Sequence, residues 1–272
     1  MTKSELLPLL SKLGVHPSRR LGQNFLVDAN MLDAMVRDAG PRAGEAILEV
    51  GPGTGVLTRK LVEAGVRLTA VEFDHRLAAH IREAYGQHPG FRLVEADACK
   101  LDYDELMGTE PWRCIANLPY SCGSVFLAHA AAAANPPQEL FILLQLEMGE
   151  RLAAREGTDD YGALTVQIQS LYQVALLRKV PGSVFHPPPE VDSAFLALRR
   201  RADAPAPEVR RRLIRLAKAG FGQRRKKLFR LIAPLFGEAE LPAAYARLGI
   251  SVDARAEELS VDTWIALAGL CP

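Results

Sequence analysis

The sequence has few cysteines, and they follow no spacing that would pair them. Among 272 residues there are four, Cys99, Cys114, Cys122 and Cys271, and none belongs to a Cys-x-x-Cys pair. Structural zinc sites and disulfide frameworks need closely spaced cysteines, so the sequence indicates neither. We therefore expect no bound metal, and reduced thiols in a cytoplasmic protein.

Long apolar segments are missing as well. The longest alanine-rich run, residues 128–134, ends at Asn135, Pro136 and Pro137, far short of the roughly 20 apolar residues that a bilayer span requires. The first residues show no basic segment followed by an apolar run, so we expect no secretory signal. With 49% hydrophobic and 24% charged residues, the composition is that of a globular protein, which we expect to be monomeric and to have no membrane partner.

Charge is distributed unevenly along the chain. The formal net charge is +1, yet residues 199–230 contain 13 Arg or Lys and 2 acidic residues, a net of +11. The other 240 residues therefore sum to −10. A concentrated basic segment indicates a polyanionic partner. A solvated helix face is the plainer alternative, but the acidic residues that normally alternate with such a run are absent.

The order of the expected elements predicts an α/β fold. A first amphipathic helix lies within residues 1–18, a loop follows at 19–26, and a second helix starts after Asp28. We expect strands at 46–50, 67–72, 91–96, 113–116, 140–145, 173–180 and 193–199. The intervening helices are expected at 54–64, after Asp74, at 122–134, up to 152 and at 161–171. Such alternation gives a parallel sheet covered on both faces. A loop joins the last two strands, which leaves room for one antiparallel strand.

The end of the chain has a different character. Residues 202–207 (ADAPAP) have the composition of a linker. After them the pattern is helical only, at about 208–219, 224–234, 242–247 and 261–268. We therefore divide the chain into an α/β catalytic domain, residues 1–201, and a small all-α domain, residues 202–272.

Residues 46–58 (AILEVGPGTGVLT) form the most informative stretch, because a buried strand runs through glycines into a helix. This is how α/β proteins hold nucleotide-like ligands. A dinucleotide fingerprint needs its third glycine at position 56, where this chain has Val56. The spacing of Glu49, Gly51, Gly53 and Gly55 instead suits S-adenosylmethionine (SAM), which has no pyrophosphate.

Polar residues end four consecutive strands, at Glu49, Glu72, Asp97 and Asn117. In a doubly wound sheet, ligands bind at these carboxyl ends. Glu72 lies 21 residues after Gly51, where an acid accepts hydrogen bonds from the ribose hydroxyls of an adenosine. Asp97 is placed for the amino edge of adenine, with helix capping as the plainer alternative.

Asn117, Leu118, Pro119 and Tyr120 suit the alkylation of an exocyclic amine. The adenine amine is a poor nucleophile because its lone pair is delocalised into the ring. An Asn117 carbonyl and a backbone carbonyl at Leu118 would accept its hydrogens and expose the lone pair, and Tyr120 offers a face for stacking. Pro119 stiffens the loop. A simple turn is the alternative.

Two further segments are candidates for the same site. Phe185 begins the proline-rich run 185–192 (FHPPPEVD) between the last two strands, where its ring offers a second stacking face or belongs to the core. Gln145 and Glu147 follow the fifth strand and either brace the loop at residues 117–120 or cap a helix.

Together these residues resemble the rRNA adenine N6-dimethyltransferases, a family of Rossmann-like class I SAM-dependent methyltransferases. The resemblance rests on residues 22–26 (GQNFL), 49–55, 72, 97, 117–120, 185–191 and 221–228 (FGQRRKKL). It is strongest for the KsgA/RsmA type, which dimethylates two adjacent adenosines in the 3′-terminal hairpin of bacterial 16S rRNA. Arg19 and Arg20 stand before the GQNFL segment, where lysines are common in the family.

The resemblance implies a SAM site, an RNA site and a ribosomal partner. The SAM contacts carry over to Asn24, Leu26, Gly51, Glu72, Asp97 and Asn117. The rRNA phosphates would be bound by Arg224, Arg225, Lys226, Lys227 and Arg230. The implied partner is 16S rRNA within a precursor of the 30S subunit. A 23S rRNA methyltransferase of the macrolide-resistance type and a non-catalytic assembly factor stay open as alternatives.

Overall fold

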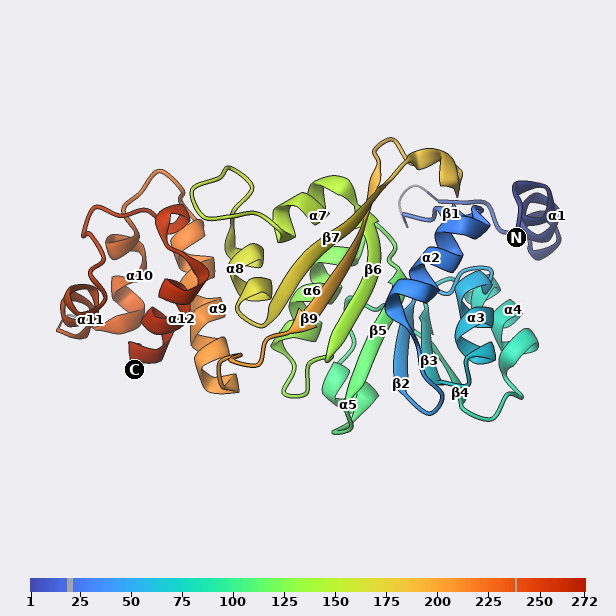
Figure 1. The fold of residues 1–272 in the computed structure, drawn as a ribbon, viewed down its shortest axis with the longest axis horizontal. Helices are drawn as coiled ribbons and strands as arrows, with labels where there is room; N and C mark the ends of the chain where they lie inside the picture. The colour runs from blue at the N-terminus through green and yellow to red at the C-terminus, as the bar shows by residue number, and fades with distance from the viewer. Residues whose placement is uncertain (19–21, 238) are drawn as a thin grey trace. The chain divides into compact units, whose positions relative to one another are not determined.

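A seven-stranded sheet with the order β4-β3-β2-β5-β6-β9-β7 organises the chain (Figure 1). The computed structural model describes residues 1–18, 22–237 and 239–272. The strands are β2 (Ala46–Val50), β3 (Arg67–Glu72), β4 (Phe91–Glu95), β5 (Trp112–Asn117), β6 (Glu139–Gln145), β7 (Tyr172–Val180) and β9 (Ser193–Arg200). Strands β4, β3, β2, β5 and β6 pair in parallel, and β9 pairs antiparallel with β6. The predicted α/β class and the antiparallel strand are therefore confirmed.

Both faces of the sheet are covered, as the apolar strands require. On one face, Ile47, Ile115 and Phe141 belong to a core that α2 (Ala29–Ala39) and α3 (Val56–Glu63) complete. Side chains alternate along β5, so Trp112 points to the other face. There it stacks on Tyr103, which also meets Phe126 edge to face. Tyr103 begins α5 (Tyr103–Met107), a helix that the sequence analysis missed, and Phe126 lies in α6 (Gly123–Ala132).

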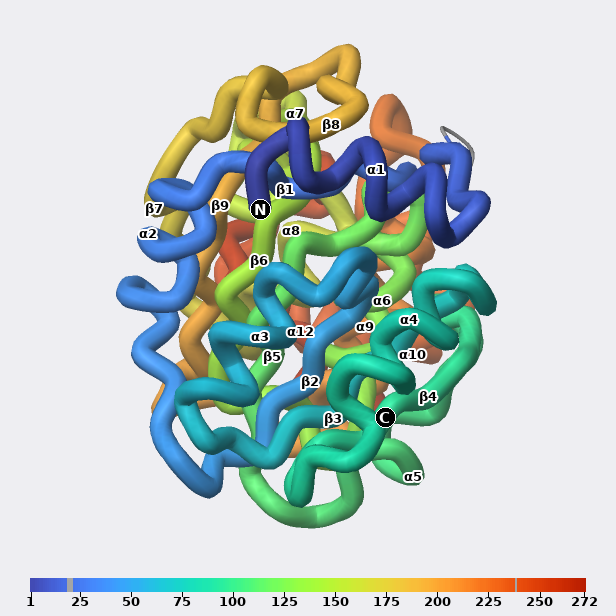
Figure 2. The backbone as a smooth tube through the Cα atoms, turned by 90° about the vertical axis from the view of Figure 1, so that its right-hand side faces the viewer, coloured from blue at the N-terminus to red at the C-terminus, as the bar shows by residue number. Residues whose placement is uncertain are grey.

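The helix before β2 and the helix after β3 begin where the sequence indicates. Asp28 caps α2 by accepting from the Met31 amide, and Asp74 caps α4 (His75–Tyr85) in the same way. The first helix, α1 (Lys3–Leu13), packs through Leu6 and Leu10 in one small core with Leu77 of α4. Figure 2 shows α1, α3 and α4 on the same side of the strands.

The chain separates into two compact units, and their boundary differs from the predicted one. The first unit comprises residues 1–149 and 175–199, and the second comprises residues 150–174 and 200–272. We assigned 150–174 to the larger domain, but Val166 and Tyr161 belong to the core of the helical unit, and Tyr161 donates a 3.0 Å hydrogen bond to Leu259 O. Apolar periodicity predicted a helix here without revealing which core buries it.

The second unit is otherwise helical, as predicted. Its core gathers around Leu213, Leu228 and Trp264. Its elements are α8 (Ala163–Gln169), α9 (Pro207–Phe221), α10 (Leu228–Phe236), α11 (Glu240–Leu248), η3 (Ala256–Glu258) and α12 (Val261–Leu270). The helix expected from 224 begins four residues later, at Leu228, so the basic run before it forms a turn.

Two short strands join distant parts of the first unit. β1 (Phe25–Leu26) pairs antiparallel with β8 (Phe185–His186), although both segments were expected to be loops. The neighbouring elements are η2 (Gly182–Val184), before β8, and α7 (Leu146–Leu152), after β6.

Across the described ranges, none of the helices combines the length and the apolar character that a membrane crossing needs.

Candidate active site

The glycine loop after β2 packs directly against the segment that follows β5. Gly51 has a φ of +72°, and a Cβ added to it would lie 2.9 Å from Cγ of Pro119. An L side chain would thus be strained by the backbone angle and would collide with the proline. The close approach of Gly51 to the Pro119 ring brings the Gly51–Gly55 loop and the Asn117–Tyr120 segment into one site.

Glu72 holds the loop from the end of β3. Its Oε2 accepts the Gly53 amide at 3.0 Å, while its Oε1 accepts the amides of Phe73 and Asp74, each at 2.9 Å. The side chain is 6% exposed, and burial raises its pKa against the lowering effect of these amides. A buried carboxylate with three backbone donors fixes the shape of the loop.

Glu49 lies beneath the same loop and is almost fully buried, with 1% of its surface exposed. Its Oε2 accepts a 2.8 Å hydrogen bond from Oγ1 of Thr58. Burial raises the pKa of Glu49 to about 8, and the nearby Glu72 carboxylate adds to the effect. At neutral pH this side chain is therefore mostly a neutral acid.

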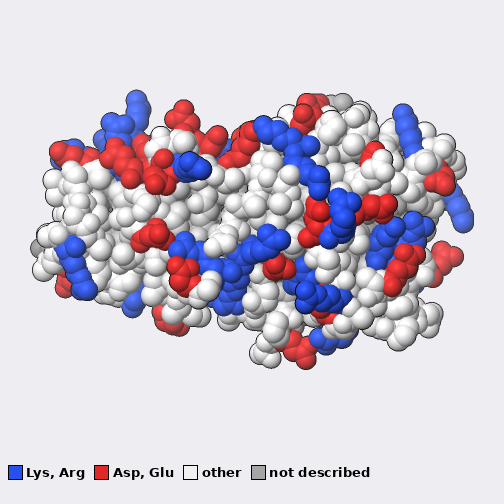
Figure 3. Space-filling view, viewed as in Figure 1, with Lys and Arg blue, Asp and Glu red and all other residues white. Residues whose placement is uncertain are grey.

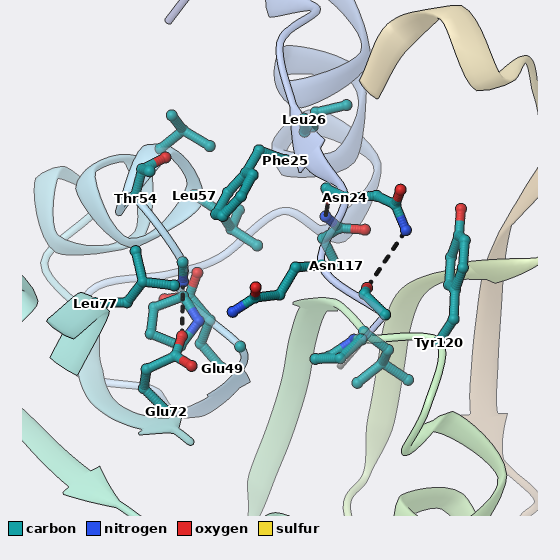
Figure 4. Close-up of a pocket in the computed structure, with 18 of the residues that line it drawn as sticks. Asn24, Phe25, Leu26, Glu49, Thr54, Leu57, Glu72, Leu77, Asn117 and Tyr120 are labelled. Carbon is teal, nitrogen blue, oxygen red and sulfur yellow. Dashed lines mark hydrogen bonds between the residues drawn. The ribbon is translucent and has the colours of Figure 1, made fainter. Parts of the chain in front are cut away.

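Asn117 is oriented by the backbone of the N-terminal segment (Figure 4). Its Nδ2 donates to the main-chain oxygen of Asn24 at 3.2 Å. A carbonyl oxygen can only accept, so the atom that faces it must be the amide nitrogen, and Oδ1 is left for other partners. Asn117 thus presents an acceptor to the site.

The rest of the Asn117–Tyr120 segment is fixed from neighbouring strands. The Leu118 amide donates to Leu143 O on β6 at 3.0 Å, and the Leu118 side chain is buried. The Tyr120 hydroxyl lies 2.5 Å from Oγ of Ser193 on β9. These contacts hold the Tyr120 ring at the border of the site, on the same side as Asn117 (Figure 4).

The site residues line two adjoining hollows around the glycine loop. Gln23, Gly51, Glu72 and Pro119 border both. The first hollow contains Asn24, Leu26, Glu49, Asn117 and Tyr120, and the second contains Phe73, Asp97, Ala98 and Cys99. Each of the six residues predicted to contact SAM therefore lines one or both of these hollows. Asp97 also caps its own turn, because its Oδ1 accepts the Cys99 amide at 2.9 Å.

The structure adds lining residues that the sequence analysis did not name. Leu57 and Leu77 provide apolar wall in the first hollow, and Phe73 does so in the second. Phe73 is 58% exposed, which is unusual for a large apolar side chain within a pocket lining. Its position in the sequence directly after Glu72, which ends β3, could have indicated that Phe73 lines the site. Arg19 and Arg20, which precede the GQNFL segment, lie outside the described residues.

Phe185 is not placed as the stacking residue that we expected. Its side chain is 3% exposed and belongs to the core around Phe195 and Leu26. The pairing of β8 with β1 turns the ring inward, so the core alternative holds in this conformation. A third hollow is instead walled by residues 187–191 together with Gly22, Tyr120 and Gln145.

The predicted RNA-binding residues are all exposed, but they are not equally available. Arg224 donates to Asp159 O at 2.7 Å, and Lys227 forms an ion pair with Asp253. Among the described residues, Arg225, Lys226 and Arg230 have no such partner. Lys and Arg side chains also gather over α9 (Figure 3), to which Arg211, Arg215 and Lys218 belong.

Metal-binding groups do not contribute to this site. Within residues 1–18, 22–237 and 239–272, no three His, Cys, Asp or Glu side chains cluster in a way that could hold an ion. The groups on offer are amide and carboxylate oxygens, backbone amides and apolar wall, which suit an organic ligand.

The parallel sheet, the glycine loop and the acids at the strand ends define a class I SAM-dependent methyltransferase. The chain matches a solved 23S rRNA methyltransferase, ErmE, with a TM-score of 0.66 at 27% identity, over 91% of this chain and 99% of that one. A dimethyladenosine transferase from Plasmodium falciparum has the same fold, with a TM-score of 0.72 at 21% identity, over 89% of this chain and 95% of that one.

Family membership follows from the sequence matches. The family described as ribosomal RNA adenine dimethylase matches residues 16–271. Two proteins named ribosomal RNA small subunit methyltransferase A are similar to this chain. The one from Sphingopyxis alaskensis is 42% identical over 262 residues (94% of each chain), and the one from Novosphingobium aromaticivorans is 39% identical over 269 residues (97% of each). The chain belongs to the ribosomal RNA adenine dimethylase family.

Proposed function

We propose that the protein is a SAM-dependent enzyme that dimethylates the N6 amines of two adjacent adenosines in the 3′-terminal hairpin of 16S rRNA. The observation that carries the proposal is the placement of the Asn117 Oδ1 acceptor beside the loop held by Glu72. A methyl donor in that loop and an amine at Asn117 would meet at the shared wall formed by Pro119. The reaction belongs to the cytoplasm, where ribosomal subunits mature.

SAM would lie across the two adjoining hollows, with its adenosine in one and its methionine part in the other. Glu72 and Asp97 flank the hollow that would take the adenosine, and Asn24 and Leu26 flank the one that would take the methionine part. Gly51 lies between them, where the lack of a side chain allows close approach. SAM supplies an activated methyl group on a sulfonium.

The chain's own residues would activate the amine by positioning it. The Oδ1 of Asn117 and the carbonyl of Leu118 would accept the two N6 hydrogens, so that the nitrogen lone pair points at the methyl group. The N–C bond forms as the C–S bond breaks, and the amine then releases a proton to solvent. Positioning of this kind supplies a large share of a barrier reduction without a general base. Tyr120 would stack on the base, held there by Ser193.

The small-subunit substrate is favoured over the alternatives by similarity. The two relatives described above that are named for the small subunit are 39% and 42% identical to this chain, against 27% for ErmE, which is named for 23S rRNA. A non-catalytic assembly factor would have no use for an Asn117 oriented by Asn24 or for a glycine loop held by Glu72. The exposed Arg225, Lys226 and Arg230 would bind rRNA phosphates.

A transfer assay tests the proposal. The protein is incubated with methyl-labelled SAM and with 30S particles that lack the modification, and 23S rRNA serves as a parallel substrate. We expect label in the 3′-terminal hairpin of 16S rRNA only. Label in 23S rRNA would favour the macrolide-resistance type, and no transfer to either RNA would favour the assembly factor.

A further inference from the structure

Gln145 ends β6 on the same side of the sheet as the proposed catalytic residues. It is the cross-strand neighbour of Ser193 on β9, whose Oγ lies 2.5 Å from the Tyr120 hydroxyl. Directly paired residues send their side chains to the same face. Asn117 is paired with Leu143, which lies two residues before Gln145, so the side chains of Asn117 and Gln145 also share a face.

Gln145 lines a hollow beside the proposed catalytic residues. The hollow is bounded by Tyr120 and Ser121 on one side and by the proline-rich residues 187–191 on the other, with Gly22 to Asn24 at its edge. Gln145 is half-buried among them. Among the residues that the structure describes, no hydrogen bond joins its side-chain amide to another group. A half-buried amide of this kind needs partners, and a ligand can supply them.

The hydrogen-bonding capacity of the site is incomplete without Gln145. Asn117 presents Oδ1 to the site, because its Nδ2 group is directed at Asn24 O, to which it donates one of its two hydrogens. The Tyr120 hydroxyl is engaged with Ser193. Adenine, however, carries a ring-nitrogen acceptor on each side of its amine, N1 and N7, and each calls for a donor. The Gln145 amide is a donor at the end of the neighbouring strand.

We infer that Gln145 recognises the target base, donating from Nε2 to a ring nitrogen beside the amine that donates a hydrogen to Asn117. This inference rests on the proposed function. A base held at both groups is fixed in its own plane, while stacking on Tyr120 fixes only its distance from the ring. Methylation of the amine does not consume the ring nitrogen, so Gln145 would hold the base during both transfers. Gln145 is therefore a specificity-determining residue.

The test combines a side-chain change with an atomic change in the RNA. The substrates are hairpin RNAs that carry adenosine, 1-deazaadenosine or 7-deazaadenosine at the target positions, each tested with wild type and with Gln145→Met. Loss of one good hydrogen bond to a base edge should lower kcat/KM about 10-fold or more. We expect Gln145→Met to show that loss on adenosine and no further loss on one of the two deaza substrates.

Controls separate recognition from folding. Gln87, exposed in the turn after α4, gives the matched variant Gln87→Met, which should behave as wild type. Both variants should keep the wild-type melting temperature and SAM affinity, because Gln145 lies outside the cofactor hollows. A kcat/KM for Gln145→Met equal to wild type on adenosine would overturn the inference, and so would independent losses on both deaza substrates.

The outcomes also separate this inference from the proposed function. If wild type methylates the hairpin adenosines and Gln145→Met does so equally well, only the role of Gln145 fails. If wild type methylates none of the hairpins or 30S particles, the proposed function fails and the recognition of adenine fails with it.

Discussion

The Asn117 side chain donates from Nδ2 to the main-chain oxygen of Asn24, 3.2 Å away, and this contact joins residues 93 positions apart. It decides which end of the amide faces the site, since a carbonyl oxygen cannot donate. It also ties the segment around β1 to the end of β5, so the GQNFL motif orients the Asn117 amide as well as lining the hollow.

Replacing Asn117 by Asp should therefore be as damaging as replacing it by Ala. A carboxylate would face the Asn24 oxygen with no proton to donate, and the repulsion would turn its oxygens away from the amine position. We expect both variants to lose at least about 100-fold in methyl transfer, because the target amine is no longer positioned. The affinity for SAM, measured by calorimetry, should fall much less. Near-normal turnover by Asn117→Asp would contradict the orientation role.

Gly51 and Gly44 form a matched pair for testing the contact between the two motifs. Both have positive φ, but a Cβ on Gly51 would collide with Pro119, whereas a Cβ on Gly44 meets nothing within 4 Å. Gly44→Ala should cost about 1 kcal/mol of stability from backbone strain alone and keep full activity. Gly51→Ala should in addition lose SAM binding and transfer. Equal activity of the two variants would show that the collision is harmless.

Glu49 should make the stability of the ligand-free protein depend on pH. Its pKa is about 8 when folded, against 4.5 ordinarily, so between these values the folded state holds a proton that the unfolded state has lost. The stabilisation of the folded state by the proton on Glu49 is complete below pH 4.5 and disappears as the pH rises to 8. Glu49→Gln has no such proton, so its stability relative to wild type should rise across this range by several kcal/mol.

Urea unfolding of wild type and Glu49→Gln at pH 5.5, 7 and 8.5 measures the effect. The variant keeps an acceptor for Thr58, so the comparison isolates the charge. Glu72 also has a raised pKa, so both proteins lose some stability with rising pH, and the difference between them reports the Glu49 charge together with its interaction with Glu72. Parallel stability curves for the two proteins would mean that Glu49 does not change its protonation in this range.

The exposed basic residues should set the salt dependence of RNA binding. Changing Arg225, Lys226 and Arg230 together to Gln removes three charges that have no acidic partner among the described residues. The slope of log K against log salt should become shallower by about 2 to 3, because each phosphate contact contributes somewhat less than one. Lys227→Gln should change it less, since Asp253 already pairs with Lys227. The slope is measured by fluorescence-anisotropy titrations in increasing KCl. An unchanged slope would mean that the RNA binds elsewhere.

The sequence predicted those parts of the site that depend on local pattern. Buried apolar runs fixed the strands, so Glu72, Asp97 and Asn117 could be assigned to strand ends that a parallel sheet brings together. The glycine spacing and Val56 selected the kind of ligand. These inferences need only the periodicity of strands and helices.

The relationships that the sequence did not predict all join distant segments. The pairing of β1 with β8 removes Phe185 from the expected stacking position and buries it. The bond between Asn24 and Asn117 and the packing of residues 150–174 with the helical unit are likewise set by tertiary contacts. Propensity carries no information on which surface a segment will find, so these could be found only in the structure.

Mass spectrometry of 16S rRNA from cells with and without the protein tests the central claim most directly. We expect N6,N6-dimethyladenosine at two adjacent positions of the 3′-terminal hairpin in cells that contain the protein. We expect unmodified adenosines in cells that lack it and in cells that carry only Asn117→Ala. Identical hairpin modification in all three strains would contradict the proposed function, as would a modification that depends on the protein and lies only in 23S rRNA.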